Sequence, residues 1–174
     1  NGITVMCPDA VVGETGVVGD VTYTKRGRSD LILLQDSNDT FLSSNWPVLE
    51  TSCTSGVEDM SSLFFNQTTF NADIGSWDVS SVTNMWGMFF GNNTFNQDIS
   101  AWDVGNVTEM SFMFQDAHQF NQEIGDWDVG NLKAIDAIFK SAYDFNGDIG
   151  DWDVGKVYYM NRSFQNASSF DRDI

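Results

Sequence analysis

Four aspartates recur at an interval of 25 residues, each in a Trp-Asp-Val triplet: Asp78, Asp103, Asp128 and Asp153. If equivalent residues stack, these carboxylates lie one above another at roughly 4.8 Å, the separation of strands in a sheet. Like charges held that close destabilise a fold. Hydrogen bonds to turn amides, exposure to water, or a Ca²⁺ ion bound by carboxylate and carbonyl oxygens would each relieve the repulsion. These aspartates are therefore the candidate binding residues, with all three arrangements open.

Little else in the chain points to metal or cofactor chemistry. A second acidic column has the same period and comprises Asp73, Asp98, Glu123, Asp148 and Asp173. No Asp-x-Asp-x-Asp-Gly loop is present, and two cysteines with one histidine are too few for a typical zinc site. We expect no cofactor and no dedicated metal site, and Ca²⁺ is the one ion that the acidic columns suggest.

Catalytic chemistry is equally unsupported by the sequence. A pair of carboxylates can hydrolyse a glycosidic bond, but nothing in so acidic a chain singles out one pair. We therefore expect no enzyme and assign no catalytic residue. Trp77, Trp102, Trp127 and Trp152 could form a platform for sugars, but they fall in phase with isoleucines and valines, which favours the core.

A 25-residue repeat must position all of these side chains. A period of this length is typical of solenoids, propellers and arrays. Trp102 and Val104 alternate with Asp103, which predicts a short strand. From Val107 onward, apolar residues recur every three to four positions, which predicts a short helix. Each repeat is thus expected to contain a strand, a turn, a helix and a return loop, and the fold class is an α/β solenoid of about five repeats.

The repeat divides the chain into two parts. Residues 1–56 do not repeat and are expected to form an N-terminal α+β cap, whereas residues 57–174 form the repeat solenoid, whose last coil is incomplete. Leu49 stands 25 residues before Ile74, so the cap is expected to end in a degenerate first coil. An atypical terminal coil is what a solenoid needs to cover its first layer.

Three local predictions apply to the cap. Residues 17–24 read as a hairpin around Gly19-Asp20. Residues 30–35 read either as a short helix capped by Ser29 or as a buried strand. Asn45-Trp46-Pro47 is expected to interrupt any regular element, because proline lacks the amide donor.

Composition restricts the class of partner. The formal net charge is −17, which argues against nucleic acid or an anionic membrane surface as the partner. No apolar run approaches the roughly 18 residues of a membrane span, and no signal peptide stands at the start.

Six Asn-x-Ser/Thr sequences occur, at Asn38, Asn66, Asn92, Asn106, Asn161 and Asn166. Such sequences are acceptors for N-glycosylation in secreted proteins. Asn66, Asn92 and Asn166 fall in one segment of the repeat, which is expected to face solvent and to carry any glycans. Chance occurrence in a chain rich in Asn, Ser and Thr is the alternative to a glycoprotein.

The pattern Ile-x-x-Trp-x-Val-x-x-Val-x-x-Met-x-x-Met-Phe resembles the repeats of BspA-like leucine-rich-repeat surface proteins. Residues 95–99 and 102–110 carry this resemblance, which covers roughly residues 50–174. It implies a right-handed solenoid of leucine-rich-repeat type, an extracellular or cell-surface location and a role in adhesion. It also implies that Asn71, Asn96, Asn121 and Asn146 form a buried asparagine ladder.

Cys7 and Cys53 are predicted to form a disulfide, because both lie in the cap and an extracellular chain tends to oxidise its thiols. Two separate buried thiols are the alternative. The predicted function is non-enzymatic adhesion or interaction with other surface proteins or glycans, without membrane insertion. The alternative is a structural subunit of an extracellular filament or surface layer. Since residues 171–174 stop in mid-coil, we expect either that further coils or another module follow, or that this end associates head-to-tail with a neighbour.

Overall fold

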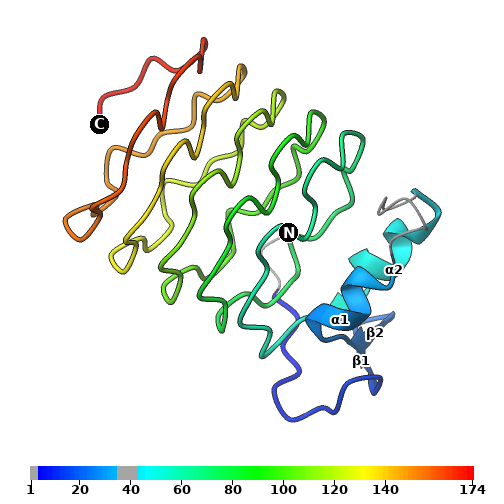
Figure 1. Ribbon diagram of the computed structural model, residues 1–174. Helices are drawn as coiled ribbons and strands as arrows, with labels where there is room; N and C mark the ends of the chain where they lie inside the picture. The colour runs from blue at the N-terminus through cyan, green and yellow to red at the C-terminus, as the bar shows by residue number, and fades with distance from the viewer. Residues whose placement is uncertain (1–3, 35–42) are drawn as a thin grey trace.

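The computed structural model describes residues 4–34 and 43–174. Figure 1 shows two regions of different character. The N-terminal region carries the helices and strands and lies at one end of the molecule. From residue 57 the chain winds in successive loops that lie side by side and lead away from this region to the C-terminus.

A small sheet forms the base of the N-terminal region. Strands β1 (Thr15–Val18) and β2 (Val21–Lys25) pair antiparallel, with Val18 opposite Val21. The two-residue turn between them is Gly19-Asp20, and Gly19 adopts a φ of 61°, which glycine reaches without steric cost. The predicted hairpin is confirmed. Strand β3 (Ser52–Cys53) then pairs parallel with β2, so the sheet order is β1-β2-β3.

Two short α-helices lie among the residues that the structure describes between β2 and β3. Helix α1 spans Arg28–Ile32, so the helix is the correct one of the two alternatives for this segment. Its N-cap is Gly27 and not Ser29, and the Gly27 amide donates to Asp30 Oδ2 at 2.9 Å. The carboxylate at the start of the helix satisfies one of the amides that the first turn leaves free.

The expected interruption at Asn45-Trp46-Pro47 is wrong. A 3₁₀ turn, η1 (Ser43–Asn45), leads directly into helix α2 (Trp46–Glu50), with Pro47 in the first turn of α2. Proline is tolerated there because the first amides of a helix have no intrahelical partner. Leu49 of α2 is fully buried, and its carbonyl accepts the Trp77 indole N–H at 2.9 Å.

The disulfide between Cys7 and Cys53 is confirmed. It joins the N-terminal segment to β3, which directly precedes the first repeat. Within the two described ranges no helix is long and apolar enough to cross a membrane.

The expected α/β solenoid of leucine-rich-repeat type is wrong. Every strand and α-helix of the described residues lies between Thr15 and Cys53, in one open three-stranded sheet and two short helices. Residues 57–174 contain neither the predicted strand at Trp102–Val104 nor the predicted helix after Val107. Turns and isolated bridges take their place, so the repeats are not strand–helix coils.

We call each 25-residue unit of residues 57–174 a layer, with layers 1 to 5 beginning at Val57, Val82, Val107, Leu132 and Val157. Neighbouring layers meet through single parallel bridges, the first between Asp59 and Asn84. Four amides of each of layers 1 to 4 then donate to carbonyls of the next layer. In layer 1 these donors are Met60, Ser62, Phe64 and Asn66, with N···O distances of 2.7–2.9 Å.

Left-handed residues explain why no helix forms in a layer. Phe112 and Asp116 have φ values of 63° and 58°, and their equivalents in the other four layers are also positive. Phe112 and Asp116 are each the third residue of a four-residue turn closed by an i→i−3 hydrogen bond, from Met113 N to Met110 O at 3.2 Å and from Ala117 N to Phe114 O at 3.1 Å. Each reversal of φ ends a turn before an i→i−4 bond can form. The amides that a helix would use internally are therefore directed to the neighbouring layer.

Phenylalanines fill the interior between layers. Phe89 and Phe95 lie in one layer with ring centroids 4.0 Å apart, and Phe89 stacks on Phe114 of the next layer at 5.5 Å. All three side chains are fully buried. The four repeat tryptophans are also buried, as predicted, and each donates its indole N–H to a carbonyl of the preceding layer or of Leu49.

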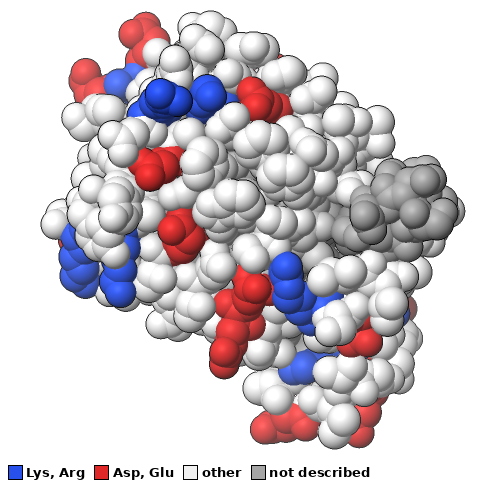
Figure 2. Space-filling view, viewed as in Figure 1, with Lys and Arg blue, Asp and Glu red and all other residues white. Residues whose placement is uncertain are grey.

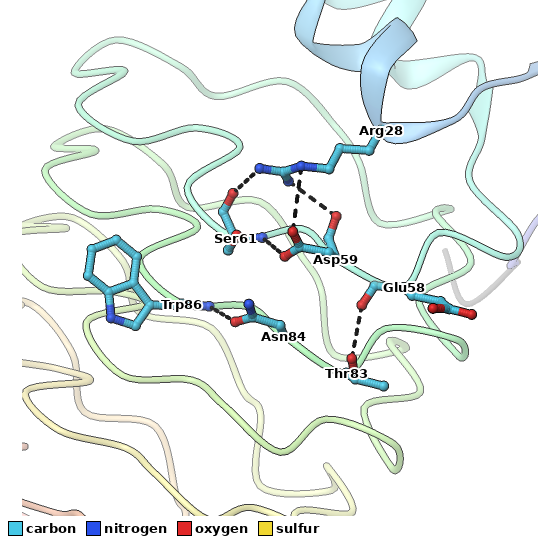
Figure 3. Close-up of polar contacts among 7 residues, drawn as sticks. All are labelled: Arg28, Glu58, Asp59, Ser61, Thr83, Asn84 and Trp86. Carbon is cyan, nitrogen blue, oxygen red and sulfur yellow. Dashed lines mark hydrogen bonds and ion pairs between the residues drawn. The ribbon is translucent and has the colours of Figure 1, made fainter.

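Arg28 of α1 covers the first layer (Figure 3). Its Nη1 and Nη2 donate to the carbonyls of Asp59 and Ser61 at 3.1 and 2.6 Å, and its Nε lies 3.7 Å from Asp59 Oδ2. In layer 2 the equivalent carbonyls accept amides of layer 1. The guanidinium thus replaces the amides that a preceding layer would supply.

Replacing Arg28 by methionine is expected to lower the free energy of unfolding by about 2 kcal/mol, because two carbonyls lose a charged donor. The free energy of unfolding of Arg28→Lys should lie between those of the native chain and Arg28→Met. An ammonium group lacks the planar guanidinium geometry that reaches both carbonyl oxygens. Urea unfolding followed by circular dichroism measures both. Lys156→Met removes an exposed charge with a single side-chain bond and should cost under about 0.5 kcal/mol. Equal losses for Arg28→Met and Lys156→Met would contradict this role.

Candidate functional site

The predicted binding aspartates do not converge on a ligand. Asp103, Asp128 and Asp153 are exposed, and each accepts the amide of the glycine two residues later, at 3.0–3.1 Å. The column is therefore a series of turn hydrogen bonds, one of the three arrangements left open by the sequence. Among the described residues no group of three or more His, Cys, Asp or Glu side chains could hold a metal ion.

Asp78 is the exception, because its side chain is 4% exposed. The Ser80 amide and hydroxyl donate to its Oδ1 at 3.1 and 2.6 Å, and the Ser55 hydroxyl bonds its Oδ2. Burial alone raises the pKa of this carboxyl. The hydrogen bonds from Ser55 and Ser80 outweigh burial, and Lys25 adds a favourable charge, so the pKa lies below its ordinary value of 3.8.

This lowered pKa predicts the acid sensitivity of the fold. A carboxyl whose pKa is depressed by folding contributes stability above its unfolded pKa, and the contribution disappears as the pH falls through the folded pKa. Asp78→Asn should therefore flatten the loss of stability below about pH 4. Ser80→Ala should flatten the loss of stability at low pH less than Asp78→Asn does, because the hydrogen bond from Ser55 to Asp78 remains. Urea unfolding at pH 2 to 7 measures the slopes, and equal slopes for Asp78→Asn and the native chain would exclude this role.

The asparagine ladder differs from the one that the resemblance implies. Asn71 Oδ1 accepts the amide of Asn96 at 3.0 Å, and the same bond recurs from Asn96 to Asn121 and from Asn121 to Asn146. The ladder links layers, as expected, but its side chains are exposed or half-buried. It is thus a surface feature and not a buried one.

The glycosylation candidates separate into three groups. Asn66, Asn106, Asn161 and Asn166 are exposed. Asn92 is fully buried, with its Oδ1 accepting the Phe95 amide at 3.2 Å, so the folded chain does not present it to a glycosylating enzyme. The predicted cluster of three therefore reduces to Asn66 and Asn166. Asn38 lies outside the described residues.

A cluster of aromatic side chains on the surface was not predicted. We call Phe65, Trp86, Phe90 and Phe112, from layers 1 to 3, the aromatic cluster. Phe65 stacks on Phe90 with centroids 4.5 Å apart and lies parallel to Trp86 at 6.2 Å. The Phe112 ring meets Trp86 edge-on at 5.6 Å. Trp86 is 38% exposed, and the three phenylalanines are half-buried.

The backbone holds Trp86 firmly (Figure 3). Its amide donates to Asn84 Oδ1 at 3.0 Å, and its carbonyl accepts the Ser62 amide at 2.8 Å. The sequence did contain a signal for this residue. Positions equivalent to Trp86 hold only polar residues, namely Ser61, Ser111, Asp136 and Asn161. An aromatic residue in a polar column of a repeat is a candidate for binding.

Carboxylates lie beside the aromatic cluster. A parallel bridge places Glu109 next to Asn84, two residues before Trp86. Asp116 follows Phe112 by four residues and is half-buried. Figure 2 shows acidic side chains on a largely uncharged face. Its basic side chains lie partly toward the end that Figure 1 colours yellow to red and partly over the N-terminal region. The cluster thus combines an apolar surface with negative charge.

The comparisons with known proteins identify a family but no function. A family model described as "Mycoplasma protein of unknown function, DUF285" matches residues 37–142 and 107–174. Together these matches include all five layers. No match to the chain was found among curated proteins or among solved structures. The chain therefore belongs to the DUF285 family.

Proposed function

We propose that this protein is a non-enzymatic recognition module that acts outside the cell in adhesion. The observation that carries the proposal is the exposed aromatic cluster. Aromatic side chains, tryptophan above all, are enriched at binding hot spots, where a few residues supply most of the affinity. Exposed apolar surface of this kind on a folded chain is characteristic of an interaction site.

The use of the polar side chains supports recognition rather than catalysis. Asp103, Asp128 and Asp153 hold turns, the asparagine ladder links layers, and Asp78 is bound within its own network. Their hydrogen bonds serve the scaffold.

Three features together support an extracellular location. The Cys7–Cys53 disulfide is typical of oxidising compartments. Exposed Asn66 and Asn166 offer sites for glycans. The resemblance of the repeat to BspA-like surface proteins adds adhesion as the biological context. We favour this function over a head-to-tail filament, because Arg28 already occupies the carbonyls of Asp59 and Ser61 that a preceding unit would need.

Trp86→Ala is expected to weaken binding to the partner by at least about 10-fold, as at other interface hot spots. The native chain and the variant are compared on arrays of glycans, of surface-protein peptides and of the native chain itself, and the best ligand is then titrated in solution. Tyr143→Ala is the matched control, because Tyr143 is 43% exposed but lies outside the aromatic cluster. It should bind as the native chain does. Absence of saturable binding by the native chain, or equal binding by Trp86→Ala, would refute the proposal.

A further inference from the structure

The charges of the repeat region are divided between its two ends. Residues 57–131, which form layers 1 to 3, carry eleven acidic side chains and no basic one. Layers 4 and 5 carry seven acidic side chains and all five basic ones of the region: Lys133, Lys140, Lys156, Arg162 and Arg172. The aromatic cluster lies entirely within the half that has no basic side chain.

Two of these basic side chains continue the columns of the aromatic cluster. Lys140 is equivalent to Phe65 and Phe90, and Arg162 is equivalent to Phe112. Hydrogen bonds keep these columns in register, since Asp116 N donates to Lys140 O and Ala137 N donates to Asn161 O, both at 2.8 Å. Arg162 is exposed and Lys140 is half-buried. One face therefore presents aromatic rings and carboxylates in layers 1 to 3, and two cations in layers 4 and 5. Asp136, in the Trp86 column of layer 4, is the carboxylate beside these cations, and it accepts hydrogen bonds from Asn161.

We propose that this face binds a second copy of the same chain, in antiparallel orientation, so that recognition is homophilic. The inference rests on the proposed function and names its partner. A twofold axis between layers 3 and 4 brings the same face of both copies together. It sets layer 3 of one copy against layer 4 of the other, and layer 2 against layer 5. Lys140 and Arg162 of one copy then lie over the aromatic cluster and the carboxylates of the other. Cations bind favourably to aromatic rings and to carboxylates.

Other arrangements of two copies lack this complementarity. A parallel side-by-side pair would place Glu109 and Asp116 of one copy against the same two carboxylates of the other. A head-to-tail pair would meet Arg28 on the carbonyls of layer 1. The net charge of −17 still opposes approach of the two copies. Because charges beyond about 8 Å are screened at physiological salt, the contact pairs persist but the association is weak.

The test uses sedimentation equilibrium of the intact, disulfide-bonded chain up to about 1 mM, the range of weak complexes. The acidic variant Lys140→Glu/Arg162→Glu gives both halves of the face a negative charge. The basic variant Glu109→Lys/Asp116→Lys replaces the two carboxylates beside the aromatic cluster by cations. The native chain should dimerise with concentration, and each variant alone should dimerise at least about 10-fold more weakly. An equimolar mixture of the two variants should recover a heterodimer.

The matched control, Lys156→Glu/Arg172→Glu, makes the same change of charge away from the columns of the aromatic cluster. It should dimerise as the native chain does, and circular dichroism establishes that every variant is folded. A monomeric native chain at all concentrations would overturn the inference, as would equal weakening by the control or a mixture that stays monomeric. If Trp86-dependent binding to another ligand is seen in that case, the proposed function stands and only the identity of the partner is wrong.

Discussion

Replacing Phe114 by alanine is expected to lower the free energy of unfolding by about 3–5 kcal/mol, the usual cost of removing a buried phenyl ring. The Phe114 ring is fully buried at the centre of the stack. Its ring centroid lies 3.9 Å from that of Phe120 in the same layer. The centroids of Phe89 and Phe139, in the layers on either side, lie 5.5 and 5.7 Å away. The vacated volume cannot collapse without moving backbone that is hydrogen-bonded to both neighbouring layers.

Phe164→Ala provides the comparison for this cost. Phe164 is equivalent to Phe114 but is only partly buried, and it contacts rings of layers 4 and 5 alone. We expect roughly half the loss, because less apolar area leaves water on folding. Urea unfolding followed by circular dichroism measures both variants. Equal losses at the two positions would show that the stack does not derive its stability from contacts on both sides of each layer.

Removing the disulfide is expected to cost about 4 kcal/mol, because the bond closes a loop of 46 residues and restricts the unfolded chain. The disulfide lies where its loss would affect both the sheet and the first layer. Cys53 is buried in β3, and its carbonyl accepts the Arg26 amide at 2.9 Å. The N-terminal region that contains this sheet also supplies Arg28 to layer 1. Loss of the bond should therefore loosen the cover of the repeat region as well as the sheet.

The measurement compares urea unfolding of the native chain with and without a thiol reductant, and of the Cys7→Ser/Cys53→Ser variant. The reduced native chain and the variant should unfold at similar, lower urea concentrations. Reductant should leave the variant unchanged, which controls for effects of the reagent. A variant as stable as the oxidised native chain would exclude the stabilising role of the bond.

Short-range patterns predicted the local features of the N-terminal region well. Gly19-Asp20 between two β-rich runs predicts a hairpin, because the turn needs a residue that tolerates positive φ. The same reasoning failed at Trp46-Pro47. Proline does break a helix in its interior, but its position relative to the first turn depends on where the helix begins. The local pattern around Pro47 does not show that start: in the folded chain α2 begins at Trp46 and buries Leu49.

The candidate site was only partly predictable. The repeat showed which aspartates share a column, and their use in turns was one of the alternatives. It could not show that Asp78 alone is buried, because Ser55 of the N-terminal region closes over it. The aromatic cluster depends on Phe65, Trp86, Phe90 and Phe112 meeting across three layers. Of these four residues, only Trp86 could be recognised from the sequence, because it is an aromatic residue at a repeat position that is otherwise polar.

The sequence by itself determined the 25-residue period, the apolar positions of the core and the residues available for the disulfide. Only the tertiary structure decided how each repeat folds. Apolar residues at three- to four-residue spacing suit a helix. They equally suit the successive four-residue turns that each layer contains. The turns prevail because amides such as Met110 and Phe114 find carbonyl acceptors in the next layer, at 3.0 and 2.9 Å. Those acceptors exist only when two repeats lie side by side, so no single repeat contains the information that selects its conformation.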